Sequence, residues 1–225
     1  MQEIKFTFNG YEATVITPDK PNGEWVWKTE FLYAFDKSER DLLDLGYTRV
    51  CYHISDKYGS YKAVRLMRKF YSFVIKKFNL NEKCHLFGFS RGGLYAFNFA
   101  LTYPDLVKSV YLDAPVLDMR SWPPKDSKER QEVYEEYDLT PETILNFKGH
   151  PVNNFEEYFS LGLNTLLVAG DADEIVPLEE NGQKMIDYCA KNGIKLPCVI
   201  KNGCKHHPHS LEDTKIIIDF VKENK

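Results

Sequence analysis

The sequence has no uninterrupted apolar run long enough to span a membrane, which argues against a membrane protein. Residues Met1 to Lys5 also lack the basic start and the apolar run of a secretory signal peptide. Cys-x-x-Cys spacing is absent among the five cysteines, which are Cys51, Cys84, Cys189, Cys198 and Cys204. We interpret them as free thiols, most of them buried, in a reducing compartment, and therefore expect a cytoplasmic protein.

A strong excess of charge of either sign is also absent. The chain has 29 Lys and Arg residues against 33 Asp and Glu residues, mixed along its length, and a net charge of -4. This balance gives no reason to expect nucleic acid or a membrane surface as a partner. The hydrophobic content of 43% allows a large core, and we expect one domain over residues 1–225.

The most informative stretch is a Gly-x-Ser-x-Gly pattern at 88–92, between a short apolar run and a helical pattern. In a strand–turn–helix context this pattern places a serine in a sharp turn at the tip of a strand. The turn packs so closely that only glycine fits at Gly88 and Gly92. The N-terminus of the following helix also favours negative charge beside Ser90. We therefore interpret Ser90 as a nucleophile rather than as part of an ordinary turn.

Strand and helix patterns alternate along most of the chain. Strands are expected at 4–8, 11–17, 25–27, 49–54, 84–87, 107–112, 165–169 and 197–201. Helices are expected at 31–45 (broken near Asp36), 61–78, 92–103, 129–137, 141–147, 155–161, 177–192 and 211–221. Asn9-Gly10 predicts a two-residue hairpin turn between the first two strands. The alternation predicts an α/β protein with a mostly parallel sheet covered on both faces.

The alternation of strand and helix patterns stops over residues 114–163, which contain prolines, charged segments and no strand pattern. A fifty-residue interruption is too long for a plain loop. We interpret it as a small helical lid inserted after the sixth strand, because active-site lids are a common reason for long excursions. The alternative is a helical patch that packs on the outside of the domain.

Three acidic residues follow the strand at 165–169, and three histidines follow the strand at 197–201. They are Asp171, Asp173 and Glu174, and His206, His207 and His209. Ligands of parallel α/β sheets bind at the carboxyl ends of the strands. A carboxylate there can orient an imidazole or can cap the next helix. The histidines could bind a metal, but adjacent residues rarely point to one ion and no fourth ligand is visible, so no metal site is expected.

The order Ser90, Asp173, His206 along successive strand ends is the order of α/β-hydrolases. On these residues and their strand context, the chain resembles the α/β-hydrolase superfamily, of the serine-esterase type, over nearly its whole length. The resemblance implies an eight-stranded, mostly parallel sheet flanked by helices. The serine would follow the fifth strand, the lid the sixth, the acid the seventh and the histidine the eighth.

Two short motifs add to the resemblance and indicate which acid and which histidine would be catalytic. The Gly-x-x-Asp-x-x-Val-Pro pattern at 170–177 resembles the acid turn of the family and selects Asp173 over Asp171. The Gly-x-x-His pattern at 203–206 resembles its histidine loop and selects His206, with His207 and His209 as alternatives. The other histidines lack such a pattern and are interpreted as structural.

The resemblance also implies a role for each residue. Ser90 would attack an acyl carbonyl, His206 would transfer the proton and Asp173 would orient His206. The backbone N–H of Arg91 would be one oxyanion donor, and that of Lys28 or Thr29 the second, where the family often has His-Gly. No metal or organic cofactor is implied.

Substrate contacts are less sharply indicated. The Arg91 side chain could hold a substrate carboxylate or could pair with a local acid. Tyr58, Met119 and Trp122 are expected to overhang the serine and to form an aromatic pocket wall, although packing alone explains them equally well.

The functional hypothesis is a serine hydrolase that cleaves a carboxylic ester of a small molecule, such as a carbohydrate acetyl ester, through an acyl-enzyme. Peptide hydrolysis and acyl transfer on the same three residues are alternatives. A non-catalytic receptor for a small ligand is a further alternative, but all three catalytic positions are filled. The oligomeric state does not follow from the sequence.

Overall fold

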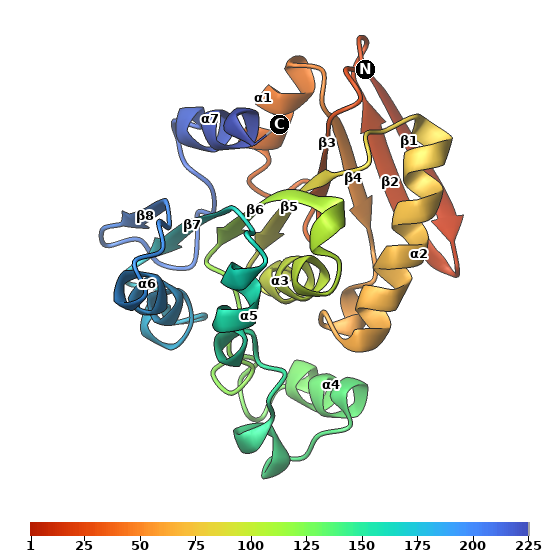
Figure 1. Cartoon of the computed structure of the whole chain (residues 1–225). Helices are drawn as coiled ribbons and strands as arrows, with labels where there is room; N and C mark the ends of the chain where they lie inside the picture. Colours follow the sequence, from red (N-terminus) through yellow and green to blue (C-terminus); the bar gives the residue numbers. More distant parts are fainter. Residues whose placement is uncertain (225) are drawn as a thin grey trace.

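The computed structural model describes residues 1–224, in which one eight-stranded sheet runs through the molecule (Figure 1). The strands are β1 (Gln2–Phe8), β2 (Tyr11–Thr17), β3 (Trp25–Lys28), β4 (Thr48–Tyr52), β5 (Cys84–Phe89), β6 (Val107–Asp113), β7 (Thr165–Gly170) and β8 (Cys198–Lys201). Their order is β1-β2-β4-β3-β5-β6-β7-β8. The pairs β1–β2 and β2–β4 are antiparallel and all the others are parallel. The predicted fold class is confirmed.

The sheet begins with the predicted hairpin. Asn9 and Gly10 have φ angles of 47° and 86°, and Phe8 pairs with Tyr11 on either side of them. Two positive φ angles in a two-residue loop give the turn twist that matches the twist of the strands. Asn and Gly are the residues that adopt this conformation most readily, so the short motif determines the register of the first two strands.

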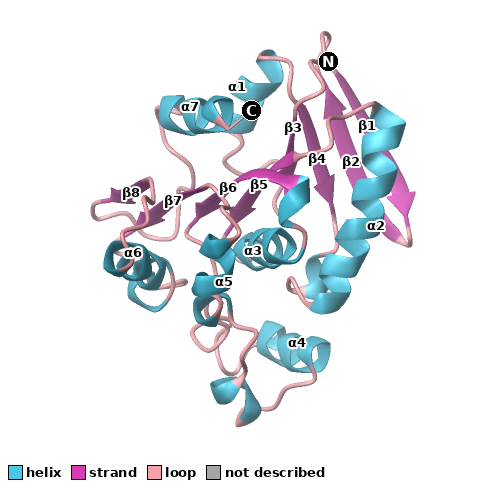
Figure 2. Cartoon of the chain, viewed as in Figure 1, coloured by secondary structure: helices cyan, strands magenta, loops and turns pink. Residues whose placement is uncertain are grey.

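Helices cover both faces of the sheet (Figure 2). They are α1 (Lys37–Asp44), α2 (Tyr61–Phe78), α3 (Gly92–Thr102), α4 (Lys128–Tyr137), α5 (Phe155–Ser160), α6 (Gly182–Lys191) and α7 (Lys215–Glu223). Shorter 3-10 helices are η1 (Ser55–Lys57), η2 (Pro104–Leu106), η3 (Thr143–Asn146), η4 (Pro151–Asn153) and η5 (Leu178–Glu180). Side chains of α2, α3 and α6 share one core with one face of the sheet, and those of α1 and α7 share another core with the opposite face.

The central strand β5 shows why the sheet has two cores. Its side chains alternate, so that Leu86 packs with α2 and α3, whereas Phe87 and Phe89 pack on the side of α1 and α7. All six residues of β5 are buried. A strand buried on both faces is a continuous apolar run rather than an alternating one, as parallel sheets require.

The longest helix, α2, has both of its ends capped. The Ser60 side chain accepts a hydrogen bond from the Ala63 N–H, and Asn79 closes the helix with a φ of 52°. Its buried face includes Met67, Phe70 and Val74. None of the helices in residues 1–224 combines the length and the hydropathy needed to cross a bilayer.

Some predicted helices are shorter than expected. The helix predicted at 31–45 forms only at Lys37–Asp44, because Phe31 and Phe35 have φ angles of 55° and 51° and lie in turns. The helix predicted at 177–192 is interrupted at Asn181, whose φ of -126° and ψ of -92° are not helical. The apolar spacing that predicted a helix continues through both segments, but turns interrupt the helical backbone.

Two further helices also differ from the prediction. Only the 3-10 helix Thr143–Asn146 forms within the segment predicted as a helix at 141–147. The last helix begins at Lys215 rather than at 211, and Leu211 instead packs beside the core on the α1 and α7 side.

Candidate active site

Ser90 lies in a sharp turn between β5 and α3, as the sequence predicts. Its φ is 52°, a left-handed conformation that is strained for a residue other than glycine. A Cβ atom added to Gly88 would lie 2.8 Å from the Ala96 Cβ, and one added to Gly92 would lie 3.0 Å from the Thr29 Oγ1. Glycine is therefore required at these two positions because the turn packs tightly between α3 and the end of β3.

The structure brings Ser90, His206 and Asp173 together. The His206 Nε2 lies 3.0 Å from the Ser90 Oγ, and the His206 Nδ1 lies 2.7 Å from the Asp173 Oδ2. An ionised carboxylate only accepts hydrogen bonds, so the Nδ1 must carry the proton and the Nε2 lone pair faces the serine hydroxyl. This tautomer allows His206 to act as a base toward Ser90.

Asp173 is fixed in the turn after β7. Its Oδ1 accepts hydrogen bonds from the backbone N–H groups of Ile175 and Val176, both at 2.9 Å. Burial of the carboxyl opposes its ionisation, but the hydrogen bonds from His206 and from these N–H groups outweigh the burial and lower the pKa of Asp173. Asp173 is therefore a carboxylate at neutral pH and stabilises a positive charge on His206.

The acid turn and the histidine loop are in direct backbone contact. A Cβ atom added to Gly170 would lie 2.1 Å from the Cys204 carbonyl oxygen, so this approach requires glycine. The Ala172 N–H donates to the same oxygen, and the Asp171 Oδ1 accepts from the Gly203 N–H at 2.6 Å. Asp171 thus holds the two loops together, whereas Asp173 contacts the imidazole.

A second histidine–carboxylate pair lies beside the first and was not anticipated from the sequence. The His209 Nδ1 lies 2.7 Å from the Asp113 Oδ1, and the Asp113 Oδ2 accepts from the Tyr111 hydroxyl and the Ser210 N–H. The rings of His206 and His209 are nearly perpendicular, with centres 4.8 Å apart. Asp113 is the last residue of β6, and its place beside the serine turn follows from the sheet rather than from any motif in the sequence.

The backbone around Ser90 determines where an oxyanion could bind. Within residues 1–224, no acceptor is found for the backbone N–H of Arg91, which begins the turn into α3. Lys28, in contrast, is the last residue of β3 and pairs with Phe87, and the Thr29 N–H donates to the Phe87 carbonyl. The two predicted second donors are therefore within the sheet or already occupied.

The loop that follows β3 is held by two buried cations. The Lys28 Nζ donates to the Ala34 carbonyl at 2.7 Å and forms an ion pair of 2.5 Å with Glu39. The Arg49 side chain donates to the Leu32 carbonyl at 2.9 Å. These contacts fix the loop at 29–36, which lies next to the serine turn.

The Arg91 side chain is paired with a local acid, one of the two alternatives considered for it. Its Nε lies 2.9 Å from the Glu30 Oε2, and the Glu30 Oε1 accepts from the Ser55 hydroxyl. The guanidinium also lies over the rings of Phe31 and Tyr58, with centres at 5.2 and 5.9 Å. Arg91 thus joins the loop after β3 to the segment around η1.

The three predicted pocket residues lie in one cluster, but they differ in exposure. Tyr58 and Met119 are only 1% and 0% exposed. Both pack in an apolar cluster with residues of the inserted segment, and Trp122 packs against that cluster while remaining partly exposed. The insertion covers Tyr58 and Met119, and a pocket wall that includes them stays a prediction.

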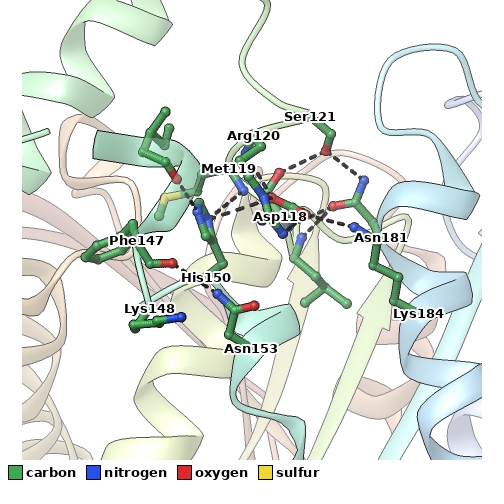
Figure 3. A network of polar contacts seen from close by, with 12 residues as sticks. Asp118, Met119, Arg120, Ser121, Phe147, Lys148, His150, Asn153, Asn181 and Lys184 are labelled. Carbon is green, nitrogen blue, oxygen red and sulfur yellow. Dashed lines mark hydrogen bonds and ion pairs between the residues drawn. The ribbon is translucent and has the colours of Figure 1, made fainter. Parts of the chain in front are cut away.

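The inserted segment is anchored by a buried polar network (Figure 3). Asp118 accepts hydrogen bonds from Arg120 and, at 2.9 Å, from Lys184 on α6. The Asn181 Oδ1 accepts from the Asp118 N–H at 3.0 Å. Burial raises the pKa of the Asp118 carboxyl, but the hydrogen bonds from Arg120 and Lys184 outweigh it and lower the pKa to about 2. The start of the insertion is thus tied to α6.

The second half of this network involves His150. Its Nε2 lies 2.8 Å from the Ile144 carbonyl oxygen, and its Nδ1 accepts from the Met119 N–H (Figure 3). Burial lowers the pKa of His150, so the neutral imidazole connects two parts of the insertion. The interpretation of His150 as structural agrees with these contacts.

The insertion has two parts with different packing. Residues of α4 and η3 form their own apolar cluster with Tyr58 and Val176. Residues of α5, in contrast, belong to the main core, where the Tyr158 ring stacks on Phe97 with centres 4.2 Å apart. Figure 1 shows α4 farther from the sheet than α5. The interpretation of 114–163 as a lid stays a prediction.

The fold and the site together define a class. A serine in a strand–turn–helix elbow, with an acid and a histidine at later strand ends of a mostly parallel sheet, is the arrangement of the α/β-hydrolase superfamily. The expected resemblance to this superfamily is confirmed by the comparisons with known proteins. The family model of the prolyl oligopeptidase family matches residues 53–224, which include Ser90, Asp173 and His206. The chain therefore belongs to the prolyl oligopeptidase family.

Solved structures with the same fold include two peptidases and one smaller hydrolase. Porphyromonas gingivalis dipeptidyl peptidase 4 has a TM-score of 0.71 at 14% identity, covering 100% of this chain and 35% of that one. A puromycin-hydrolyzing peptidase of Mycobacterium tuberculosis has a TM-score of 0.74 at 12% identity, covering 98% and 38%. Fluorophosphonate-binding serine hydrolase F of Staphylococcus aureus has a TM-score of 0.72 at 14% identity, covering 99% and 95%.

The extent of these matches differs. The chain spans a little over a third of the length of the two peptidases, but nearly the full length of the staphylococcal hydrolase. A comparison with curated protein sequences gave no match. At these identities, the structural likeness establishes the fold.

Proposed function

We propose that the chain is a serine hydrolase that cleaves a carboxylic ester of a small molecule through an acyl-enzyme intermediate. The observation that carries this proposal is the 3.0 Å contact between the His206 Nε2 and the Ser90 Oγ in the elbow after β5. A serine hydroxyl becomes nucleophilic when a neutral imidazole can accept its proton at that distance. The second contact, from His206 to Asp173, orients the imidazole for this task.

The proposed reaction has two halves. The Ser90 Oγ attacks the acyl carbon while its proton passes to the His206 Nε2, and Asp173 stabilises the resulting imidazolium. His206 then protonates the leaving alkoxide, and the alcohol departs. In the second half, His206 removes a proton from water as the water oxygen attacks the acyl carbon. The bond between the acyl carbon and the Ser90 Oγ then breaks, the carboxylic acid departs and His206 returns the proton to Ser90. Every proton transfer uses a group of this chain.

The oxyanion would be held by backbone N–H groups at two loops. The Arg91 N–H is the first donor, at the N-terminal end of α3. For the second donor we propose the N–H of Glu30 or Phe31 in place of Lys28. Neither N–H has an acceptor within residues 1–224, and the Glu30 nitrogen lies 3.6 Å from a Cβ atom built on Gly92. The position of the Glu30 nitrogen near Gly92 supports this choice.

An ester is proposed over a peptide on two grounds. Ester cleavage expels an alkoxide, a better leaving group than an amide nitrogen, so it needs less positioning of the leaving group. The chain also spans only about a third of the two similar peptidases, whereas it covers 95% of a similar serine hydrolase. The exposed ring of Phe31, which lies against Arg91, and the partly exposed ring of Trp122, which lies near Tyr58, suit a sugar ring, and a carbohydrate acetyl ester is the narrower proposal.

Peptidase activity is the second candidate, because the chain belongs to the prolyl oligopeptidase family. The two candidates share Ser90, His206 and Asp173 and differ in the group that leaves first. The free cysteines among residues 1–224 support the further proposal of a reducing, cytoplasmic location.

A substrate panel tests the proposal. Chromogenic esters of increasing acyl length and acetylated sugars are compared with dipeptide arylamides. We expect the fastest turnover with a short acyl ester, and its loss in the Ser90→Ala variant. The exposed Ser160→Ala variant on α5 is the control and should keep full activity. Faster turnover of the arylamides would replace the ester proposal with the peptidase one, and turnover in Ser90→Ala would remove both.

A further inference from the structure

Three imidazoles meet at the end of β8, and the proposed reaction uses only one of them. The rings of His206, His207 and His209 have centres 4.8, 4.9 and 5.0 Å apart. One ligand atom from each ring can be chosen so that all three lie within 4.8 Å of one another. Three imidazoles bound to one tetrahedral zinc ion, with Zn–N bonds of about 2.0 Å, have ring centres about 5 Å apart. The spacing of the rings in this loop therefore matches a three-histidine metal site.

Two of the three rings already have the partners that metal-binding histidines have. The Nδ1 atoms of His206 and His209 lie 2.7 Å from Asp173 and Asp113, so each donates its N–H to a carboxylate. This arrangement leaves the Nε2 of each ring unprotonated in the neutral state, and it orients the ring and raises its basicity toward a metal. Both rings and both carboxylates are buried, so the pair of ligands is fixed before any ion arrives.

The third ring completes the site from the solvent side. His207 is exposed and stacks on Phe35, with ring centres 5.3 Å apart and planes 19° from parallel. Within residues 1–224 no hydrogen bond engages the His207 ring nitrogens, so this exposed ring can turn toward the other two. The loop carbonyls of Pro208 and Ser210 are held by the Lys201 ammonium, which keeps the histidines together.

We propose that His206, His207 and His209 bind a divalent transition-metal ion of the zinc type, with solvent as the fourth ligand, and that the ion inhibits the hydrolase reversibly. A metal on the His206 Nε2 occupies the lone pair that would accept the Ser90 proton at 3.0 Å. The ion is thus an inhibitor and not a cofactor. The binding part of the inference is independent of the proposed function, and the inhibition part rests on it.

Metal binding is measured first, with Zn²⁺ titrated against a chromophoric chelator and with Co²⁺ as a visible-absorption probe. The inactive Ser90→Ala chain is used so that turnover has no part in the result. We expect one ion per chain and a Co²⁺ band of tetrahedral nitrogen ligation. Adding His207→Ala should weaken binding at least about tenfold. Adding His53→Ala, a partly exposed histidine elsewhere, or Cys204→Ser should leave the affinity unchanged.

Two binding results would overturn the site. One is equal Zn²⁺ affinity with and without His207, and the other is loss of binding in Cys204→Ser, which would assign the ion to the thiol. Because His207 is exposed, the His207→Ala chain is expected to fold normally, and the Zn²⁺ sensitivity of each chain is expressed relative to its own metal-free rate.

Inhibition is then measured on the chain with Ser90 present. Zn²⁺ should suppress ester turnover and fluorophosphonate labelling of the wild type, EDTA should restore both, and His207→Ala should require at least about tenfold more Zn²⁺. Equal sensitivity of the wild type and His207→Ala would contradict the mechanism. If no ester is turned over at all, the binding titration still decides the metal site, so the two failures are distinguishable.

Discussion

At the scale of single residues, the histidine loop presents two imidazoles that are each oriented by a buried carboxylate. His206 faces Ser90 and is held by Asp173, whereas His209 packs against His206 and is held by Asp113. The sequence predicted the first set because its members lie in spaced motifs. It could not predict Asp113, because an aspartate that ends a strand has no pattern of its own until the sheet places it beside the loop.

The role of Asp173 gives a prediction. Asp173→Asn should lower kcat by about 10⁴, because an amide cannot fix the His206 tautomer or stabilise its cation. Steady-state kinetics on the best ester of the panel would measure this. Asp171→Asn is the matched control, since an asparagine oxygen can still accept from the Gly203 N–H. A loss below about tenfold in Asp173→Asn would contradict the assignment.

His209 is predicted to be a positioning residue that acts through His206. His209→Ala should lower kcat about tenfold or more while KM stays nearly unchanged, because only the orientation of the base is disturbed. His209→Asn should recover much of the loss, since its amide N–H can replace the Nδ1–H toward Asp113. Equal changes in kcat for both variants, or a change confined to KM, would assign His209 a different role.

At the scale of elements, the loop after β3 departs most from the expectation. The apolar spacing at 31–45 indicated a helix, but Phe31 and Phe35 adopt positive φ angles and α1 begins only at Lys37. The loop is instead held by Lys28 and Arg49, which donate to the carbonyl oxygens of Ala34 and Leu32 and also pair with Glu39 and Asp36. Apolar spacing does not reveal such contacts, so this part of the site could not be read from the sequence.

The buried ion pair between Lys28 and Glu39 leads to a prediction about stability. Lys28→Met should lower the free energy of unfolding by about 3–5 kcal/mol, because it leaves Glu39 buried without its cation. The double variant Lys28→Met with Glu39→Met should recover much of that loss, since neither charge then remains buried. Urea denaturation would measure both, with the exposed Lys20→Met as control. A single-variant loss below about 1 kcal/mol would show that the pair is not buried in solution.

Elements with strong local signals were predicted well. The Asn9-Gly10 turn, the capped helix α2 and the continuous apolar run of β5 each have one local solution, and the structure adopts it. Two helices of the insertion were also predicted within a residue of their observed bounds, at Lys128–Tyr137 and Phe155–Ser160. The packing of the insertion could not be predicted, because its anchor consists of Asp118, Asn181 and His150, which are far apart in the sequence. The length of the insertion excluded a plain loop, but the sequence did not predict how the insertion packs.

At the scale of the whole molecule, the partly buried carboxylate of Glu24 links stability to pH. The Glu24 carboxyl contacts His85 and lies 2.7 Å from the Lys108 ammonium, and hydrogen bonds from His85 and Lys108 lower its pKa to about 2, against an ordinary value of 4.5. Because the folded pKa lies below the unfolded one, the stabilisation is fully present above about pH 4.5 and is lost as the pH falls toward about 2.

The corresponding prediction compares the wild type with Glu24→Gln. The variant should be less stable at pH 7, and the difference in the free energy of unfolding should shrink as the pH falls from about 4.5 to about 2. Urea denaturation at a series of pH values, with the solvent-exposed Glu174→Gln as the control, would measure it. A difference that is constant over this pH range would show that the Glu24 pKa is not lowered by folding.

Chemical labelling tests most directly whether Ser90 is the nucleophile. The chain is treated with a fluorophosphonate probe, and the modified residue is located by peptide mass spectrometry. We predict a single adduct on Ser90, formed much more slowly in His206→Ala and absent in Ser90→Ala. An adduct on another residue, or no adduct under conditions that label a known serine hydrolase, would contradict the account.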